Sequence, residues 1–333
     1  MISEQRFNEI LDNFEKIDPI LVVGDVGVDK YTYGEVNRIS PEAPVPILEV
    51  SKEWTKLGLA ANVSDNLHSL KAKSTICSVI GDDQNGNILE DLLEEAGLKT
   101  WGLVRDKSRM TTFKERVVTE TQQICRVDYE TKEPIETNIY ERVKDRFNEF
   151  KEAHSALILE DYGKGFFTKD MTEFFIKEAK SIGRMVAVDP SRTTPPSWYK
   201  GATLLKPNKA ESLMMAQCLG SSEKDIEKVA MLLVDKLDLK KIIITLGSEG
   251  MGMIDTEADG KFHKIPTVAK EVFDVSGAGD TAISAVVSAM VSSATLEEAA
   301  WVGNCASGVV VGKKGTALAT QEELKASYPS LLK

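Results

Sequence analysis

The chain has 333 residues and a mass of 36.6 kDa, which suits one large α/β domain or two ordinary ones. Its 41 Lys and Arg against 52 Asp and Glu give a net charge of −11, so long-range electrostatics oppose binding to nucleic acid or to an anionic membrane. No apolar stretch reaches the roughly 18 residues of a membrane span, and the first residues lack the basic and apolar segments of a signal peptide. We therefore expect a cytoplasmic globular protein that binds an anionic ligand only at a locally positive pocket.

The N-terminal part of the chain is predicted to begin an α/β body. Apolar residues at helical spacing follow Ser3, a suitable N-cap, and residues 20–24 form a buried-strand pattern. Residues 60–70, 74–81 and 86–96 then give the patterns of a helix, a strand and a helix. This order indicates consecutive strand and helix units of one main body.

Two segments interrupt this body with short alternating strands. Residues 31–50 contain three prolines and patchy alternation of apolar and polar residues, which is typical of edge strands. Alternation returns within residues 105–128. We predict that both segments pair into one small β-sheet, inserted as a lid into a single domain of residues 1–333.

Strands and helices alternate regularly from residue 156 onward. The runs at 157–159, 185–188 and 242–245 are apolar on both faces and are separated by helical patterns. Such strands indicate a parallel sheet that is covered on both sides. The predicted fold class is therefore α/β, with three α/β/α layers around a mostly parallel central sheet.

The segment with the most chemical information is 274–280, directly before a helix of small residues. Gly277, Ala278 and Gly279 let backbone N–H groups approach a ligand closely, and a helix start adds partial positive charge, so they can form an anion hole. Asp280 then lies beside the anion, where a carboxylate can accept the proton of an attacking hydroxyl. This arrangement favours phosphoryl transfer. The alternative is a plain glycine-rich helix start with an acidic first turn.

Two common nucleotide-binding folds are disfavoured. No Gly-x-x-x-x-Gly-Lys-Ser/Thr loop occurs, and the glycine spacing at 24–29 does not fit the dinucleotide fingerprint. Asp25 and Asp29 follow the predicted strand end, where open α/β sheets bind ligands. Carboxylates suit the vicinal hydroxyls of a sugar, although either Asp can equally be a turn residue.

Together these residues resemble the signatures of the ribokinase-like carbohydrate kinases, the PfkB family. Segment 274–280 matches the second family signature, and segment 58–62 resembles the first. Segment 206–211 resembles the Asn-x-x-Glu motif of the family, and segment 245–250 resembles its nucleotide-side loop. The resemblance spans nearly the whole chain, and it implies a ribokinase-like fold and ATP-dependent phosphorylation of a sugar with Mg²⁺.

The resemblance also implies roles on the sugar side. Asp280 would be the base, with Gly277, Ala278 and Gly279 around the transferred phosphoryl group. The sugar hydroxyls would be held by Asp29 and Asn62, next to Gly58. Because a protein of charge −11 must supply local cations for a sugar phosphate, the candidate phosphate contacts are Arg38, Lys114, Arg116 and Lys164. Lys114 and Arg116 can equally be solubilising side chains of an exposed strand.

On the nucleotide side, the resemblance assigns a larger set of residues. The nucleotide pocket would comprise Lys206, Asn208, Glu211, Thr245, Gly247, Asn304 and Gly308. Asn208 and Glu211 would hold Mg²⁺ through water, because this ion keeps part of its hydration shell. Asp274 is a candidate for a monovalent cation such as K⁺. Asn304 and Gly308 can instead simply permit tight helix packing.

Within the family, segments 38–46, 122–128 and 161–165 resemble the kinases that phosphorylate D-glycero-D-manno-heptose 7-phosphate at the anomeric oxygen. This resemblance implies a homodimer formed through the lid. In many bacteria this kinase is fused to a C-terminal nucleotidyltransferase domain, and the sequence ends at Lys333 without one. We therefore expect a stand-alone kinase.

Two positions depart from the family pattern. Leu59 stands where the family usually has the second of two adjacent glycines, and its side chain is expected to occupy space near the sugar. Gly27 stands where heptose kinases usually carry a bulkier apolar residue. The open alternatives are a kinase for another sugar phosphate or for a nucleoside, and a non-catalytic sugar-phosphate sensor on the same fold.

Overall fold

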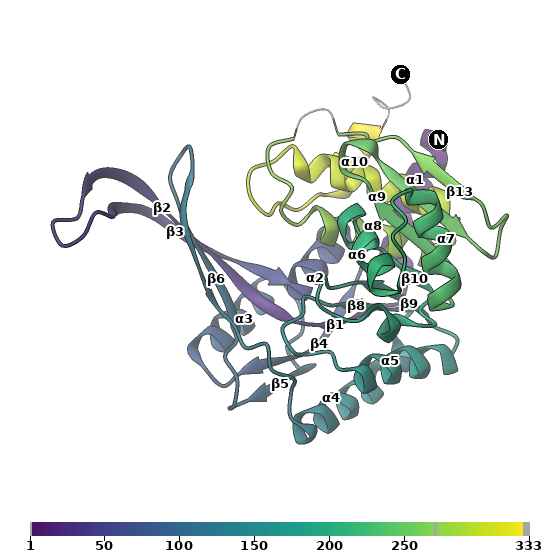
Figure 1. The fold of residues 1–333 in the computed structure, drawn as a ribbon, viewed down its shortest axis with the longest axis horizontal. Helices are drawn as coiled ribbons and strands as arrows, with labels where there is room; N and C mark the ends of the chain where they lie inside the picture. The colour runs from purple at the N-terminus through teal and green to yellow at the C-terminus, as the bar shows by residue number, and fades with distance from the viewer. Residues whose placement is uncertain (1, 270–271, 329–333) are drawn as a thin grey trace.

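A nine-stranded sheet runs through the body of the molecule in the order β13-β12-β11-β10-β9-β8-β1-β4-β5 (Figure 1). The structure is a computed structural model that describes residues 2–269 and 272–328, so Lys333 lies outside the described residues. The strands are β1 (Ile20–Gly24), β4 (Ser74–Gly81), β5 (Leu103–Asp106), β8 (Ala156–Glu160), β9 (Met185–Asp189), β10 (Leu204–Leu205), β11 (Lys241–Thr245), β12 (Met251–Asp255) and β13 (Phe262–Ile265). Only the pairs β11–β12 and β12–β13 are antiparallel in this described sheet.

Helices cover both faces of this sheet. One apolar core takes residues from α1 (Glu4–Asp12), α2 (Ala60–Ser69), α3 (Gln84–Glu95), α8 (Ala278–Val291), α9 (Leu296–Val311) and α10 (Gln321–Ser327). The other takes residues from α4 (Thr137–Phe150), α5 (Lys169–Ser181), α6 (Lys209–Cys218) and α7 (Ile226–Leu237). Short 3₁₀ turns occupy Phe14–Lys16, Lys151–Ala153, Pro196–Tyr199 and Gly247–Glu249.

The central strand β1 explains this arrangement. Val22 packs in the first core and its neighbour Val23 in the second, because successive side chains of a strand point to opposite faces. A strand that is apolar on both faces must be covered twice. The predicted α/β class with three layers and a mostly parallel sheet is therefore confirmed. Among the described residues, no helix combines the length and the apolar character needed to cross a bilayer.

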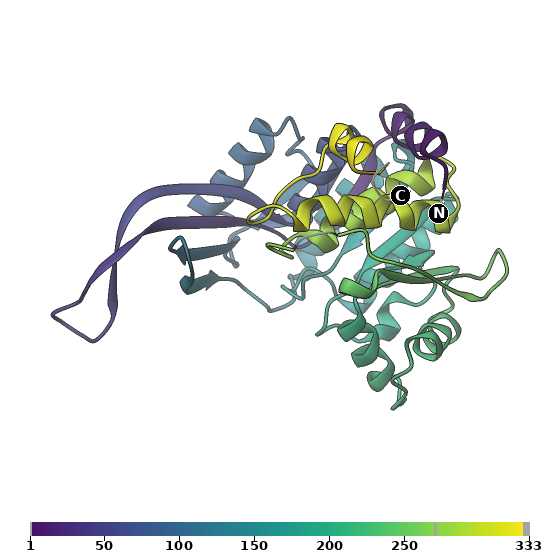
Figure 2. The same ribbon diagram turned by 90° about the horizontal axis from the view of Figure 1, so that it is seen from above.

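A second sheet of four strands extends from this body in the order β3-β2-β6-β7. Its strands are β2 (Val26–Ile39), β3 (Pro46–Leu59), β6 (Thr112–Val118) and β7 (Gln123–Tyr129). β2–β3 and β6–β7 are antiparallel hairpins, and β2 pairs with β6 in parallel. Figures 1 and 2 show that the β2–β3 hairpin projects far from the layered body.

The bounds of the second sheet differ from the predicted 31–50 and 105–128. β2 and β3 extend to residues 26 and 59, while residues 105–106 belong to β5 of the large sheet. The inner ends of β2 and β3 are buried on both faces, so they lack the alternation by which the outer parts were recognised.

The β2–β3 hairpin changes character along its length. β6 pairs with β2 only from Gly27 to Tyr33. Register irregularities follow between Tyr33 and Gly34 and between Val36 and Arg38. We call the part from the first irregularity outward, residues 34–50, the hairpin tip. Its exposed large apolar side chains include Ile39, Val45 and Val50.

Candidate active site

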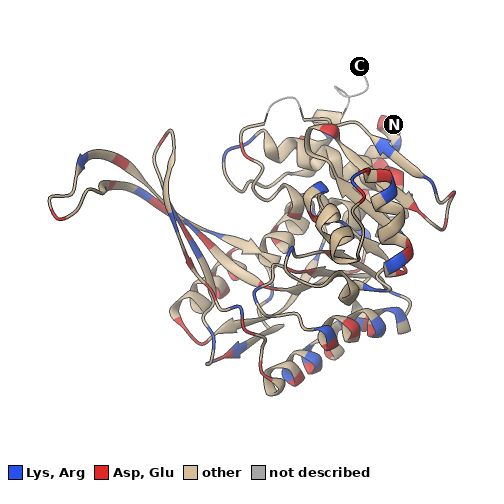
Figure 3. Cartoon of the chain, viewed as in Figure 1, with Lys and Arg blue, Asp and Glu red and all other residues tan. Residues whose placement is uncertain are grey.

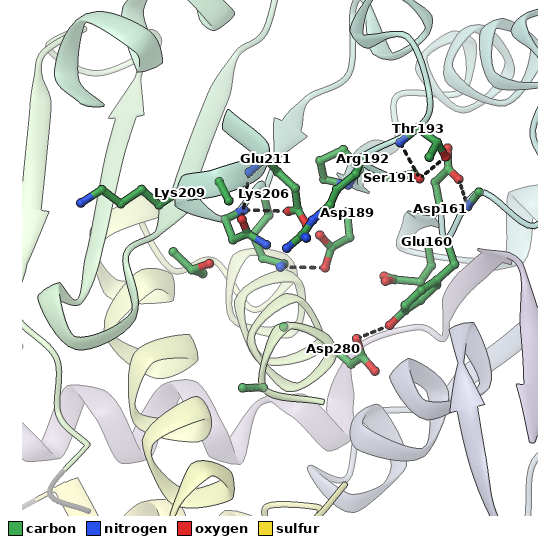
Figure 4. Close-up of a pocket in the computed structure, with 18 of the residues that line it drawn as sticks. Glu160, Asp161, Asp189, Ser191, Arg192, Thr193, Lys206, Lys209, Glu211 and Asp280 are labelled. Atoms are coloured by element: carbon green, nitrogen blue, oxygen red, sulfur yellow. Dashed lines mark hydrogen bonds and ion pairs between the residues drawn. The ribbon is translucent and has the colours of Figure 1, made fainter. Parts of the chain in front are cut away.

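A cavity of about 980 Å³ lies where the carboxyl ends of the parallel strands meet the start of α8 (Figure 4). Glu160 ends β8 and Asp189 ends β9, while Lys206 directly follows β10. These side chains and Asp280 line the cavity. Ligand sites of open α/β sheets form at this edge because the strand ends and the following loops converge there.

The start of α8 is built closely against its neighbours. Gly277 has φ +78°, in the left-handed region, and a Cβ atom on it would lie 2.8 Å from Cγ2 of Thr316 and 3.2 Å from Nδ2 of Asn62. Only glycine fits this position. A Cβ on Gly279 would lie 3.7 Å from Nζ of Lys206. The N–H of Ala278 donates to Val275 O at 3.2 Å, and both Ala278 and Gly279 line the cavity.

Asp280 has partners on both carboxylate oxygens. The Tyr162 hydroxyl donates to Oδ1 at 2.7 Å, and Asn62 Nδ2 donates to Oδ2 at 2.5 Å. Burial raises the pKa of Asp280, and these two hydrogen bonds oppose that rise. The carboxylate is thus oriented from two different elements of the fold.

Lys206 and Asp189 form a buried ion pair beside Asp280, with 2.7 Å between Nζ and Oδ2 (Figure 4). Burial would lower the pKa of Lys206, but the charge and hydrogen bond of Asp189 raise it. Burial raises the pKa of Asp189 to about 6, against the pull of Lys206. Burial, with the charges of Asp189 and Asp280, also holds the pKa of Glu160 well above its usual range. The ammonium of Lys206 is thus the charge-balancing group among several buried carboxylates.

The predicted sugar residues Asp29, Gly58 and Asn62 come together next to Asp280. A Cβ on Gly58 would lie 3.3 Å from Cγ of Asp29, so the glycine leaves room for this carboxylate. Asp29 accepts a hydrogen bond from Nη1 of Arg116 at 2.8 Å. Asn62 reaches the same region through its contact with Asp280.

Four cations gather around this sugar side, three on β6 and β7 of the second sheet and one, Lys164, in the loop after β8. Charged residues of both signs lie along the strands of the second sheet (Figure 3). Three of the four cations have carboxylate partners: Arg116 with Asp29, Lys164 with Glu130 at 2.5 Å, and Arg126 with Asp128 at 2.6 Å. The fourth, Lys114, lies over the Tyr162 ring with Nζ 5.5 Å from the ring centroid. Within the described part of the chain, no carboxylate lies within ion-pair distance of Lys114, and its pKa is lowered by burial and by the neighbouring cations.

The structure does not bring Arg38 to this group. Arg38 lies in the hairpin tip, where its side chain is 63 % exposed and its Nε is 3.6 Å from Oε1 of Glu49. Arg38 lies near the outer end of the long strand β2, and only the inner end of this strand reaches the sugar side. Within a single chain, Arg38 therefore does not reach the predicted sugar side.

A second cavity of about 390 Å³ adjoins the first through shared lining residues and contains the predicted Thr245, Gly247, Asn304 and Gly308. Asn304 Nδ2 donates to Pro266 O at 2.7 Å. A Cβ on Gly308 would lie 2.8 Å from Cγ2 of Val268. Both residues therefore pack against the chain before residue 270. The alternative role in packing thus applies to them, beside their place in the lining of the cavity.

Asn208 and Glu211 cap α6 and line the larger cavity. Oδ1 of Asn208 accepts from the Glu211 N–H, and Oε2 of Glu211 accepts from the Asn208 N–H, both at 2.9 Å. This reciprocal pair is a capping box. The second Glu211 oxygen lies 3.5 Å from Nε of Arg192. The Asn-x-x-Glu spacing thus builds the helix start and presents a carboxylate to the cavity.

Asp274 lies outside the lining of both cavities. Its Oδ1 accepts the Ser276 N–H at 2.9 Å, and its own N–H donates to Val311 O at 3.3 Å. These contacts form the turn that leads into α8.

Sequence reasoning missed three groups that lie at the centre of the site: Glu160, Tyr162 and Asp189. Each stands at the carboxyl end of a buried strand or just after it. That position is a usable signal, because the ends of parallel strands meet at one edge of a sheet. Asp25, by contrast, is a structural residue, since its carboxylate accepts the N–H groups of Tyr162, Lys164 and Phe166 at 3.1–3.2 Å.

Known proteins resemble this chain in sequence and in fold. It is 42 % identical over 314 residues to the bifunctional protein HldE of Nitratiruptor sp., covering 94 % of this chain and 66 % of that protein. It is 38 % identical over 317 residues to HldE of Helicobacter pylori, covering 94 % and 68 %. The chain thus spans about two thirds of the length of these relatives.

Solved structures agree with this likeness at the level of the fold. Phosphofructokinase-2 of Escherichia coli in complex with potassium has a TM-score of 0.77 at 20 % identity, covering 95 % of this chain and all of that one. Ribokinase of Arabidopsis thaliana, complexed with ribose and ATP, has a TM-score of 0.72 at 19 % identity, covering 93 % and 98 %. The fold is therefore ribokinase-like. The family model described as pfkB family carbohydrate kinase matches residues 21–323, and the chain belongs to that family.

Proposed function

We propose that the protein transfers the γ-phosphoryl group of ATP to the anomeric oxygen of D-glycero-D-manno-heptose 7-phosphate. The observation that carries the proposal is the group of four cations beside Asp29, in a protein of net charge −11. Lys114 is the cation of this group that lacks a carboxylate partner among the described residues, so it is the best candidate contact for a substrate phosphate. The motif resemblance to heptose 7-phosphate kinases and the identity of 42 % to an HldE protein support the same substrate.

In this proposal Asp280 accepts the proton of the anomeric hydroxyl as that oxygen attacks the γ-phosphorus. The new O–P bond forms while the bond to the leaving ADP oxygen breaks. Lys206 and the backbone around Gly277 and Gly279 would stabilise the charge on the transferred group, because donors aimed at developing charge favour the transition state. Asp29 and Asn62 would hold the sugar.

Mg²⁺ is part of the proposal. Carboxylate and amide oxygens are the hard ligands that this ion takes, often through water. Glu160, Asp189, Glu211 and Asp280 line one cavity, and Oε2 of buried Glu160 has no hydrogen-bond partner among the described residues. This excess of carboxylate fits a divalent cation that enters with ATP, with Asn208 and Glu211 as its contacts through water. When bound, the ion would neutralise charge on the phosphates. A monovalent cation such as K⁺ near Asp274 remains a proposal from resemblance alone.

We also propose a cytoplasmic homodimer that forms through the second sheet. The support is the hairpin tip, where exposed Ile39 and Val50 are large apolar side chains that another surface can cover. In such a dimer the tip of one chain, with Arg38, would lie near the other chain. The second sheet would then close over the sugar and exclude water, which competes with the sugar hydroxyl.

The test is a coupled ADP-release assay over heptose 7-phosphate, heptose, other sugar phosphates and nucleosides. We expect the highest kcat/KM with heptose 7-phosphate. A higher kcat/KM with a nucleoside or with another phosphosugar would replace the proposed substrate. Tight sugar-phosphate binding by calorimetry with no ADP release on any substrate would favour the non-catalytic sensor.

A further inference from the structure

The Tyr162 hydroxyl lies 2.7 Å from Oδ1 of Asp280 and donates a hydrogen bond to it. The other oxygen of Asp280 takes its hydrogen bond from Asn62. Asn62 is also a proposed sugar contact, so its amide is shared with the substrate. Tyr162 is therefore the donor that can stay on the carboxylate throughout the reaction, while Oδ2 faces Asn62 and the sugar side.

Tyr162 is held firmly enough to orient a carboxylate. The N–H groups of Tyr162, Lys164 and Phe166 all donate to the buried carboxylate of Asp25, at 3.1, 3.1 and 3.2 Å. The ring lies beneath Lys114, with Nζ 5.5 Å from its centroid. The backbone and the ring are thus fixed by contacts that do not involve the hydroxyl.

We propose that Tyr162 is a positioning residue for the reaction, which holds the carboxylate of Asp280 in its charged and correctly oriented form through one hydrogen bond. This inference rests on the proposed function, because it gives Asp280 the role of base. Tyr162 lies in segment 161–165, where the resemblance gave a role only to Lys164, and two parts of its side chain have separate roles. The hydroxyl serves the base, and the ring serves Lys114.

The surroundings of Asp280 give this bond a measurable effect. Burial raises the pKa of Asp280, and the Tyr162 hydrogen bond is the larger of the two that oppose the rise. The pKa of Tyr162 is itself held well above its usual range by burial and by Asp280, so the phenol stays a neutral donor throughout an assay. The other charged groups that face Asp280 from the surrounding elements are Lys206, Asp29, Glu160 and Asp189.

The first test is the pH profile of kcat/KM for the full chain and for Tyr162→Phe. Removing a hydrogen bond to the charged form raises the pKa of the carboxyl, so the acid limb should move to higher pH by about one unit, the scale of one hydrogen bond to a charged group. The ring remains, so the preference for heptose 7-phosphate over heptose should be retained. A sugar phosphate also titrates near pH 6, and both proteins are therefore compared on the same substrate.

Tyr199→Phe is the matched control. Tyr199 is a buried tyrosine whose hydroxyl also donates to a carboxylate, Asp161 Oδ2 at 2.8 Å. If Tyr162 acts only by filling space or by stabilising the fold, the two variants should behave alike. We expect the acid limb of Tyr199→Phe to stay in place. An unmoved acid limb in Tyr162→Phe, with or without a uniform loss of kcat at all pH values, would overturn the inference.

A second measurement does not depend on turnover. The pKa of the Asp280 carboxyl can be read by ¹³C NMR of the aspartate-labelled protein, with Asp280→Asn used to assign the signal. It should rise in Tyr162→Phe and fall when 3-fluorotyrosine, a stronger donor, replaces Tyr162. If the protein shows no kinase activity but these shifts appear, the proposed function fails and the positioning contact stands. If kinase activity is present and neither pKa shift appears, the positioning role of Tyr162 fails and the proposed function stands.

Discussion

Cδ1 of Leu59 lies 3.2 Å from the point that a Cβ atom on Gly27 would occupy. The two departures from the family pattern are thus neighbours in space. Leu59 has φ 58° and ψ −136°, in a region that favours glycine, and its side chain is 6 % exposed. It packs toward β2 and lines neither of the two cavities. We therefore predict that Leu59 acts in packing between β2 and β3 and does not select the sugar.

This geometry predicts an unusual order of stability at position 59. Leu59→Ala loses about 1.5 to 3 kcal/mol of apolar burial but keeps the strained backbone. Leu59→Gly loses that burial and about 0.8 kcal/mol more for the Cβ atom, but it relieves about 1 to 3 kcal/mol of backbone strain, so the glycine variant should have the higher melting temperature. Sugar selectivity should not change in either variant. A glycine variant less stable than the alanine variant, or a changed ratio of kcat/KM between sugars, would mean that Leu59 is placed differently.

Asp280→Asn should lower kcat by about 10² or more, the usual scale for loss of a general base. Asparagine keeps the shape of the side chain, so ATP affinity measured by calorimetry should be nearly unchanged. Turnover close to that of the unmodified protein would remove Asp280 from the chemistry. Turnover and ATP affinity lost together would instead indicate a disturbed fold.

Lys114→Met should reduce the preference for heptose 7-phosphate over heptose by about tenfold, which corresponds to one charge-assisted hydrogen bond. Lys144→Met is the control, because Lys144 lies 4.2 Å from the centroid of the Tyr140 ring on the outer helix α4. This control variant removes a lysine that has the same kind of ring contact but lies away from the site. Equal kcat/KM for heptose 7-phosphate and heptose in the unmodified protein would refute the phosphate contact.

The environment of Asp25 predicts how the stability of the folded protein changes with pH. Burial, with the charge of Asp161, raises the pKa of Asp25 to about 6, although three backbone N–H groups oppose the rise. Between its unfolded pKa of about 4 and this value, the folded protein binds more protons than the unfolded chain. The stability contribution of Asp25 is therefore full near pH 4 and is lost as the pH rises through about 6.

The measurement is urea unfolding of the unmodified protein and of Asp25→Asn across this range. The difference in unfolding free energy between them should shrink as the pH rises, by up to about 1.4 kcal/mol per unit. A constant difference at all pH values would show that Asp25 does not change its proton binding on folding.

Much of the large sheet could be predicted from the sequence because its strands are apolar on both faces and are separated by amphipathic helices. The bounds of the second sheet were harder to predict, since the inner half of β2 and the last three residues of β3 are as buried as core strands. The anion-hole segment ending at Asp280 is local in sequence, so its spacing identified it. Tyr162 and Asp189 meet Asp280 and Lys206 through the convergence of separate strand ends, so a local pattern can place each residue at a strand end but cannot show which residues meet.

The pairing of β6 with β2 ends at Tyr33, and this has a consequence for the hairpin tip. Beyond that residue, a ribbon of two strands stands without β6 and after two register irregularities, and two-stranded ribbons are only marginally stable in water. Amide hydrogen exchange should therefore change abruptly along β2, slow before Tyr33 and fast after Gly34. Protection of the tip that grows with protein concentration would show that the ribbon becomes ordered only when a second chain covers it.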